Sequence, residues 1–160
     1  MAKLARSLLD ASTLCAIASF SGRQAHVNTA YFAWADDFRL IWLSEPGAKH
    51  SRNVRDNGSV AIAVFDSHQK WGTSDRGVQL FGSARELKGK QAEAAERAYA
   101  KRFPDYRRED NSAYAFYSLR PRRLKLFDER TLGPGVFVTA RVAADGELGW
   151  ERTEVYRATS

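Results

Sequence analysis

The sequence has almost no cysteine and no long apolar run, and these two absences limit the kinds of protein it can be. One cysteine, Cys15, among 160 residues excludes an internal disulfide framework and a cysteine-rich zinc site. The longest purely apolar run, from Val60 to Phe65, is far too short to cross a bilayer. Lys3 and Arg6 precede apolar residues, but Asp10 interrupts that segment and argues against a signal peptide. We therefore expect a soluble, cytoplasmic protein with no membrane partner.

Signatures of the common catalytic and cofactor sites are also missing. The sequence contains no Gly-rich dinucleotide fingerprint, no P-loop and no nucleophile-elbow pattern. Its three histidines, His26, His50 and His68, share no i,i+4 spacing, so no metal site is expected. Cys15 lies in an apolar strand segment, which is typical of a small buried side chain. The sequence therefore names no catalytic nucleophile, no acid–base residue and no metal ligand.

The charge balance indicates an anionic small molecule rather than nucleic acid as the partner. The 25 Lys and Arg residues exceed the 19 Asp and Glu residues, giving a net charge of +6. The positive charges are spread along the chain, and the densest stretch, 120–125, is typical of a solvated strand face. No zinc-finger spacing or aromatic RNA-binding signature accompanies them. A phosphate-bearing small molecule is therefore the more economical anion, and nucleic-acid binding is not expected.

The length and hydrophobic patterning predict one domain, 1–160, built mainly of short strands. Several such strands with two or three helices favour an α+β fold with a closed or half-closed β-barrel. The expected organisation is an N-terminal helix at 1–13, a barrel at 14–142 with helices near 48–56 and 90–103, and a C-terminal tail at 143–160. Within the barrel, strands are expected at 14–20, 25–34, 38–43, 60–65, 77–87, 114–119, 124–127 and 136–142.

The segment 43–54 combines a strand end, a Pro-Gly turn and a short helix. Ser44 offers a hydroxyl at the strand end, and free backbone N–H groups follow at the helix start. Lys49, His50 and Arg52 add positive charge or hydrogen-bond donors within one turn. Phosphate groups bind at such donor-rich helix starts. The alternative is an ordinary capped helix whose Lys and Arg side chains are solvated.

The strand before this segment mixes polar and apolar residues where a core strand would alternate cleanly. Asn28 lies within it and can both donate and accept hydrogen bonds, which matches the polar edge of a flat heterocycle. Exposed backbone groups of the same strand could do likewise. The alternative is an edge strand with one solvated face.

The order of these motifs resembles the pyridoxamine 5′-phosphate oxidase-like family of FMN-binding split barrels. The resemblance covers residues 8–87 and consists of a helix, three strands and a Ser-x-x-x-x-Lys-His-x-x-Asn turn. An Asn-Gly helix stop, an apolar strand and the segment 76–82 follow in the same order. The helix ending in Arg-Phe-Pro at 102–104 and the Thr-Leu-Gly segment at 131–133 resemble a small branch of that family.

The resemblance implies a homodimer of α+β split barrels with FMN bound at the subunit interface. It places 27–30 along the isoalloxazine ring, Trp42 and Ser44 on the strand leading to the phosphate, and Lys49 and His50 at the phosphate. It also places Gln79 near the flavin, and Trp71 in a loop that could reach the ring. The cofactor-binding residues implied in this way are Val27, Asn28, Thr29, Ala30, Trp42, Ser44, Lys49, His50 and Gln79.

Two departures from the family pattern argue against oxidation of pyridoxamine phosphate. Ala48 stands where the vitamin-making oxidases carry an arginine, so Arg52 would have to supply the missing charge or phosphate affinity would be weaker. No histidine follows His68, so the C-terminal arginine–histidine pair that reads substrate in those oxidases cannot be built.

The leading functional hypothesis is an FMN-dependent oxidoreductase acting with a small-molecule substrate or electron donor. The flavin would carry the electron chemistry, and the protein would position it and shape a pocket. The alternative is a non-catalytic binding protein for flavin, a deazaflavin coenzyme or haem, for which His26 or His50 would be the haem ligand.

Overall fold

The structure is a computed structural model that describes residues 1–157, and its centre is an antiparallel β-barrel. The strands lie in the order β3-β2-β1-β4-β5-β6-β7-β8, and β3 also pairs with β6, which closes the first six strands into a barrel. The α+β split barrel predicted from the sequence is confirmed. In chain order the elements are α1 (Ala2–Asp10), β1 (Leu14–Ser21), β2 (Gln24–Trp34), β3 (Leu40–Ser44), α2 (Lys49–Asp56), β4 (Ser59–Phe65), β5 (Arg76–Glu86), α3 (Lys90–Arg102), the 3₁₀ turn η1 (Glu109–Asn111), β6 (Ala115–Asp128), α4 (Glu129–Leu132), β7 (Val136–Val142) and β8 (Leu148–Val155).

The barrel interior is filled by alternate side chains of its strands. In β4, Val60, Ile62 and Val64 point inward and are buried, whereas the residues between them face outward. Trp42 of β3 stacks on Tyr117 of β6 inside the barrel, with ring centroids 5.9 Å apart. This two-residue alternation is what a barrel strand with one buried face requires.

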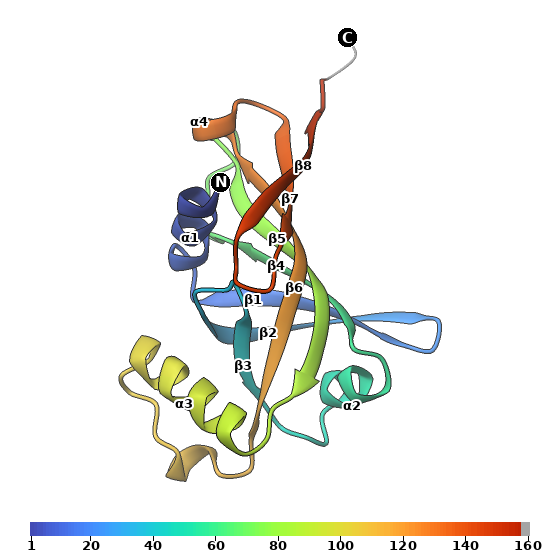
Figure 1. The fold of residues 1–160 in the computed structure, drawn as a ribbon, viewed down its shortest axis with the longest axis vertical. Helices are drawn as coiled ribbons and strands as arrows, with labels where there is room; N and C mark the ends of the chain where they lie inside the picture. The colour runs from blue at the N-terminus through green and yellow to red at the C-terminus, as the bar shows by residue number, and fades with distance from the viewer. Residues whose placement is uncertain (158–160) are drawn as a thin grey trace.

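Helix α3 covers part of the outside of the barrel and forms a second, smaller core. Its residues Ala95 and Tyr99 pack against Ala33, Ile41 and Phe116 of three strands. Figure 1 shows α3 low on the molecule, away from the long β7–β8 hairpin and α4 at the opposite end. No helix within residues 1–157 is long and apolar enough to cross a membrane.

Strand β6 is one continuous strand, whereas two separate strands were expected at 114–119 and 124–127. Pro121 lies within it, at a β-bulge that leaves Arg122 without a partner on β5. Gly82 stands opposite Pro121, and a Cβ at that position would lie 2.1 Å from the carbonyl oxygen of Arg120. The glycine lets the two backbones approach closely enough for the ladder to continue past the proline.

The expected C-terminal tail at 143–160 is corrected by the structure over residues 148–155. This segment forms β8, which pairs with β7 through a turn containing Gly146 at φ +88°. Most β8 side chains are exposed on both faces, so the strand lacks the apolar alternation that predicts strands. The last part of the expected tail, 158–160, lies outside the described residues.

Candidate functional site

A pocket of about 590 Å³ opens where β2 and β3 separate. The two strands pair only through residues 32–34 of β2 and 40–42 of β3. Residues 24–31 of β2 pair with β1 on one side and, within residues 1–157, have no strand partner on the side that faces β3. The start of α2, the end of α3 and the loop before β6 close the pocket on its other sides. One wall is polar and contains Asn28, Ser44, Glu45 and His50.

Ser44 and His50 are joined by a hydrogen bond at the base of the turn between β3 and α2. The Ser44 hydroxyl contacts Nε2 of His50, and Ser51 donates its hydroxyl to Ser44 at 3.0 Å. Burial lowers the pKa of His50, and the nearby His26 lowers it further. The two imidazole rings are stacked, with centroids 6.3 Å apart and planes 5° from parallel. The neutral form of His50 is therefore favoured inside the site.

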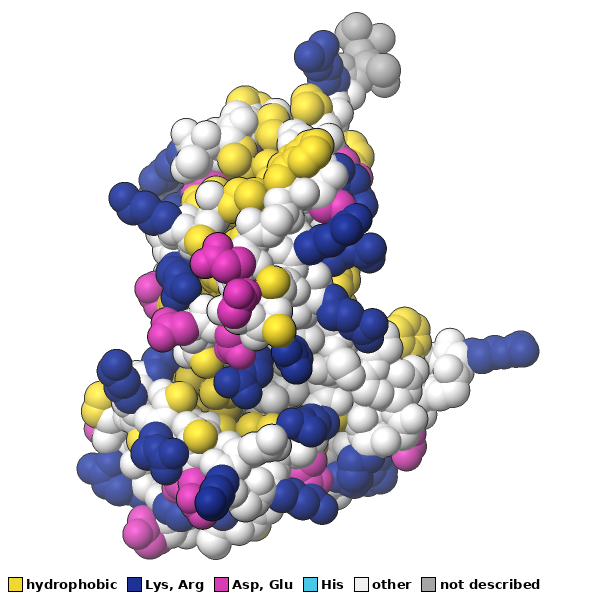
Figure 2. All heavy atoms as spheres, in the orientation of Figure 1, with side chains coloured by type: hydrophobic (Ala, Val, Ile, Leu, Met, Phe, Trp, Pro, Cys, Tyr) yellow, Lys and Arg dark blue, Asp and Glu magenta, His cyan; other side chains and the backbone are white. Residues whose placement is uncertain are grey.

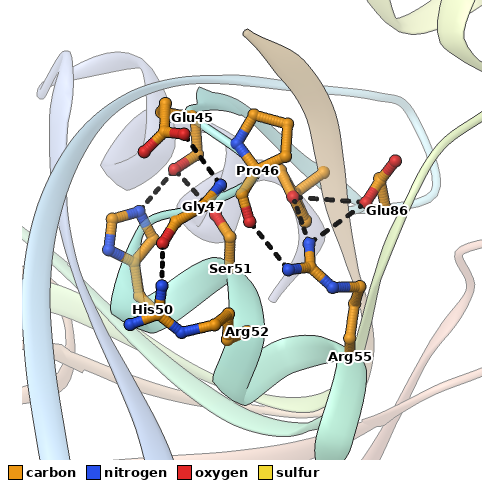
Figure 3. Close-up of polar contacts among 10 residues, drawn as sticks. Glu45, Pro46, Gly47, His50, Ser51, Arg52, Arg55 and Glu86 are labelled. Atoms are coloured by element: carbon orange, nitrogen blue, oxygen red, sulfur yellow. Dashed lines mark hydrogen bonds and ion pairs between the residues drawn. The ribbon is translucent and has the colours of Figure 1, made fainter.

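Two arginines of α2 fix the shape of the turn from behind, as Figure 3 shows. Arg52 donates to the carbonyl oxygen of Gly47, and Arg55 donates to that of Pro46 at 2.7 Å. Arg55 also lies 3.4 Å from the carboxylate of Glu86. Of the two alternatives left open by Ala48, weaker phosphate affinity or a charge supplied by Arg52, the contact of Arg52 with the Gly47 carbonyl favours the first.

The first turn of α2 leaves hydrogen-bond donors free. Ala48 precedes the helix, and no side chain caps its backbone N–H groups. Lys49, the first residue of the helix, is exposed and makes no ion pair or side-chain hydrogen bond within residues 1–157. Free N–H groups at a helix start, with a cation beside them, bind anions well.

Asn28 lies on the polar wall with an unusual feature. Its Oδ1 atom is buried and has no hydrogen-bond partner within the described chain. Buried acceptors without partners destabilise a fold by roughly 1–3 kcal/mol, so they are rare unless something else satisfies them. Behind this wall, Asn53 of α2 donates to Ser19 of β1 at 3.1 Å and fixes the helix against the sheet.

The structure brings together some of the expected cofactor-binding residues and separates others. Trp42 lies on β3, the strand that ends at Ser44, but its side chain is 1% exposed in the barrel core and does not line the pocket. Val27 and Gln79 lie on the outer face of the sheet, because each is one residue out of phase with the inward-facing positions of its strand, and neither lines the pocket. Lys49 lies beside the pocket, and Trp71 is 102% exposed in the loop 66–75. Those that do line the pocket are Asn28, Thr29, Ala30, Ser44 and His50.

An aromatic wall faces the polar one and was not expected from the sequence. Tyr99 and Phe103 stand on the helical repeat of α3, and that repeat predicted only a core-facing helix. Burial raises the pKa of Tyr99 to about 12, so its hydroxyl stays protonated. The signal that could have indicated a site is the density of aromatic residues between 99 and 117. The aromatic residues of this wall are Tyr99, Phe103, Tyr106 and Tyr114.

The site has the chemistry of an anion cradle joined to an aromatic slot. No group of three or more His, Cys, Asp or Glu side chains in residues 1–157 is placed to hold a metal ion. The polar wall offers hydroxyl, amide and backbone donors, and the opposite wall offers flat apolar surface. A ligand with a phosphate at one end and a planar ring at the other fits this arrangement.

Solved structures share this fold at low sequence identity. The heme binding protein from Mycobacterium smegmatis matches with a TM-score of 0.69 and 19% identity, over 88% of this chain and 57% of that one. The FAD binding protein from Mycobacterium smegmatis matches with a TM-score of 0.63 and 16% identity, over 80% and 96%. HutZ, the heme storage protein from Vibrio cholerae, matches with a TM-score of 0.63 and 14% identity, over 76% and 91%. The chain thus spans little more than half the length of the first of these proteins.

A search of curated proteins gave no match. A family model described as pyridoxamine 5′-phosphate oxidase matches residues 1–128, from α1 to the end of β6. The matched part includes every element that lines the pocket and excludes the β7–β8 hairpin. The resemblance seen in the sequence is confirmed, and the chain belongs to the pyridoxamine 5′-phosphate oxidase family.

Proposed function

We propose that this protein is an FMN-binding oxidoreductase whose substrate is not pyridoxamine phosphate. The observation that carries the proposal is the meeting of Asn28, Ser44 and His50 with the uncapped start of α2 in one pocket. A bound flavin supplies hydride and electron transfer, and the protein binds and orients it. The FAD binding protein from Mycobacterium smegmatis, which shares the fold, supports a flavin as the ligand.

The phosphate of the cofactor would lie against the first turn of α2. The backbone N–H groups there would donate to its oxygens, and Lys49 would balance its charge from the exposed side of the helix. Ser44 would add a hydroxyl donor, because its hydrogen bonds to His50 and Ser51 hold its side chain at the pocket. The Glu45 carboxylate accepts a hydrogen bond from the Gly47 N–H at 2.9 Å, which holds this side chain against the turn.

The ring system would lie between β2 and the aromatic wall. Asn28 offers an acceptor, Oδ1, that lacks a partner, and a ring N–H group would satisfy it. The unpaired edge of β2 adds backbone donors and acceptors beside it. Tyr99 and Phe103, with centroids 4.7 Å apart, provide apolar surface for a planar ring and exclude water from one side.

A second copy of this chain would cover the outer face of β1, β2, β4 and β5. This face is apolar and carries no charged side chain in its central rows, where Ala18 stands between Val27 and Ala61, and Ala16 between Thr29 and Ala63. Large exposed apolar patches of this kind mark interfaces. The β1–β2 hairpin also projects from the body of the barrel in Figure 1, and an isolated two-stranded ribbon is marginally stable in water. The large exposed apolar side chains of this face are Leu14, Phe20, Val27, Tyr31, Phe65 and Phe81.

The dimer would also explain the separation of Gln79 from the pocket. Gln79 lies in the row Thr29–Ala16–Ala63–Gln79, which crosses the proposed interface. In a two-fold dimer the same row of the second copy lies against this one, so a cofactor at the edge of the interface could reach side chains from both copies.

A haem-binding role is the second candidate, and one observation favours it. His26 stacks on His50, which lines the pocket, and two structures that share the fold are a heme binding protein and a heme storage protein. Nε2 of His50 contacts the Ser44 hydroxyl, so His26 would be the residue that holds the haem iron. A haem protein would show a strong Soret absorbance band that His26→Ala removes.

The visible absorbance spectrum of the purified protein, followed by titration with FMN, tests the proposal. We expect quenching of FMN fluorescence with a dissociation constant in the micromolar range, and oxidation of NADH or NADPH in the presence of a suitable acceptor. Lys49→Ala should weaken FMN binding about ten- to a hundredfold, because one charge-assisted contact contributes about 1.5–3 kcal/mol.

Lys88→Ala is the matched control, because Lys88 is an exposed lysine outside the pocket. Unchanged FMN fluorescence at protein concentrations of about 100 µM would refute flavin binding. Stoichiometric binding without any turnover would instead indicate the non-catalytic alternative, for FMN or for a deazaflavin coenzyme.

A further inference from the structure

A second polar recess lies on the outer side of the barrel, away from the pocket described above. Its volume is about 440 Å³, and it shares no lining residue with that pocket. Three arginines converge on it from three strands or their ends: Arg39 just before β3, Arg85 on β5 and Arg120 on β6. Two serines, Ser83 and Ser118, stand between them.

The strand register explains why these side chains meet. Ser83 pairs with Arg120 across β5 and β6, and Arg85 pairs with Ser118 two positions further on. Because side chains alternate along a strand, all four project from the same outer face. The pairing of β3 with β6 brings Arg39, at the start of β3, beside them.

The recess has more positive charge than its own residues balance. Arg39 is paired with Asp37, its Nε lying 2.7 Å from the carboxylate, and Arg85 donates to the neutral side chain of Gln91 at 3.0 Å. Arg120 has no carboxylate partner within residues 1–157. The three guanidinium groups that line the recess therefore share one carboxylate, that of Asp37, and the recess keeps a net positive charge. Figure 2 shows Lys and Arg side chains gathered across the middle of the face that carries β6.

The two serines add hydroxyl groups to the recess. Ser118 is only 6% exposed, and Ser83 stands on the same outer face, opposite Arg120. A serine hydroxyl can donate a hydrogen bond to a phosphoryl oxygen.

An apolar recess of about 340 Å³ adjoins the polar one beneath α3. The two share Arg39 and Ser118, so a single molecule could occupy both. The apolar part is lined by Ile41, Leu87 and alanines of α3. Figure 2 shows hydrophobic side chains inside the hollow at the upper edge of the α3 region.

We propose that these two connected recesses form a second ligand site, which binds a small phosphomonoester with an apolar body. The three guanidinium groups and two hydroxyls match the terminal oxygens of a doubly charged phosphoryl group, whereas a single carboxylate would engage only one arginine fork. The body of the ligand packs against Ile41, Leu87 and α3. The site is independent of the proposed flavin pocket.

Phenyl phosphate is the probe, and the full-length protein is titrated with it by calorimetry and by NMR mapping of backbone amides. We expect binding with amide shifts centred on residues 83–85 and 118–120, and weaker binding of phenylacetate, which carries one charge. Phenol should not bind measurably. Arg120→Gln should weaken phenyl phosphate binding about tenfold or more, with an unchanged thermal unfolding midpoint because Arg120 is exposed.

Arg122→Gln is the matched control, because Arg122 is an exposed arginine of the same strand that does not line the recess. It removes the same charge, so it should leave the affinity within about twofold. Equal weakening by both variants would overturn the proposal, because it would show a general charge effect. Absence of binding at millimolar phenyl phosphate, or shifts confined to residues 44–50, would also overturn it. Lys49→Ala distinguishes the two sites, because it should weaken FMN binding and leave the affinity for phenyl phosphate unchanged.

Discussion

At the scale of single residues, the polar turn of the pocket between β3 and α2 is built from side chains that are close in the sequence. Ser44 and His50 lie within one strand end and helix start, so the sequence assigned them to one site, whereas the contact of Ser51 with Ser44 was not predicted. Trp42 and Gln79 could not be placed in the same way. Whether a strand residue faces the core or the outer surface depends on the register, and a shift of one residue reverses the face. The sequence does not display that register.

His50 should make the stability of the protein depend on pH below neutrality. Burial lowers the pKa of His50 in the folded state below the ordinary value of 6.5, so below pH 6.5 the unfolded chain binds this proton more readily. The free energy of unfolding should therefore fall as the pH decreases from 6.5 toward the lowered value, and this contribution should be constant above 6.5. Chemical denaturation between pH 5 and 8 measures it.

His50→Gln should reduce this dependence, since glutamine does not titrate. The control is His68→Gln, because the His68 side chain is exposed in the loop 66–75 and lies outside the pocket. Identical slopes for the wild-type protein and His50→Gln would contradict the assignment of the effect to His50.

At the scale of elements, the predictions succeed where one face is consistently apolar. The spacing of Ala95 and Tyr99 predicted α3, and the apolar run in β4 predicted a central strand. β8 was missed because it carries few apolar side chains and its carboxylates pair with cations of β6 and β7, such as Glu151 with Arg123 at 3.0 Å. Residues 148–155 form a strand because they pair with β7. That pairing depends on the whole fold and cannot be read from the local sequence.

The bulge between β5 and β6 predicts a position where a single methyl group is not tolerated. In Gly82→Ala the new Cβ would lie 2.1 Å from the carbonyl oxygen of Arg120, so the two strands must separate. We expect the free energy of unfolding to fall by roughly 2–3 kcal/mol, as for other overpacked sites. Thermal or urea denaturation measures the change.

Gly149→Ala is the corresponding control in a strand. Nothing lies within 4 Å of a Cβ at Gly149, so this substitution should alter stability by no more than about 0.5 kcal/mol. A similar loss in both variants would mean that strand glycines matter here for a reason other than close approach of the backbones.

At the scale of the whole molecule, the hydrophobic patterning predicted a closed or half-closed barrel of short strands, but it did not predict which two strands close it. β3 and β6 are separated by some 70 residues, and their pairing depends on every element between them. The apolar outer face of β1, β2, β4 and β5 also appears only when the strands are aligned. Alanines such as Ala18 and Ala61 carry little signal by themselves, and they form a continuous surface only in register.

The proposed dimer predicts the effect of a charge on that face. Val27 is 65% exposed in the isolated chain and sits next to Ala18. In Val27→Lys an unpaired charge would be buried at the interface, and removing a charge from water costs several kcal/mol. We expect sedimentation or light scattering at micromolar concentration to give a dimer for the wild-type protein and a monomer for the variant.

Val155→Lys is the control, because Val155 is a similarly exposed valine on β8, outside the proposed interface. It should leave the dimer intact. A wild-type protein that sediments as a monomer would contradict the dimer, and so would a Val27→Lys variant that stays dimeric.

The clamp formed by Arg52 and Arg55 has a consequence for how quickly a ligand is captured. Both guanidinium groups donate to backbone carbonyls of the turn between β3 and α2. The turn therefore has the conformation needed for binding before the ligand binds. The loss of backbone freedom occurs once, when the polypeptide folds, and is not repeated at each encounter. The association rate should then be limited by diffusion and by orientation of the ligand rather than by a slow rearrangement of the protein. Differences in affinity between ligands should lie mainly in their dissociation rates.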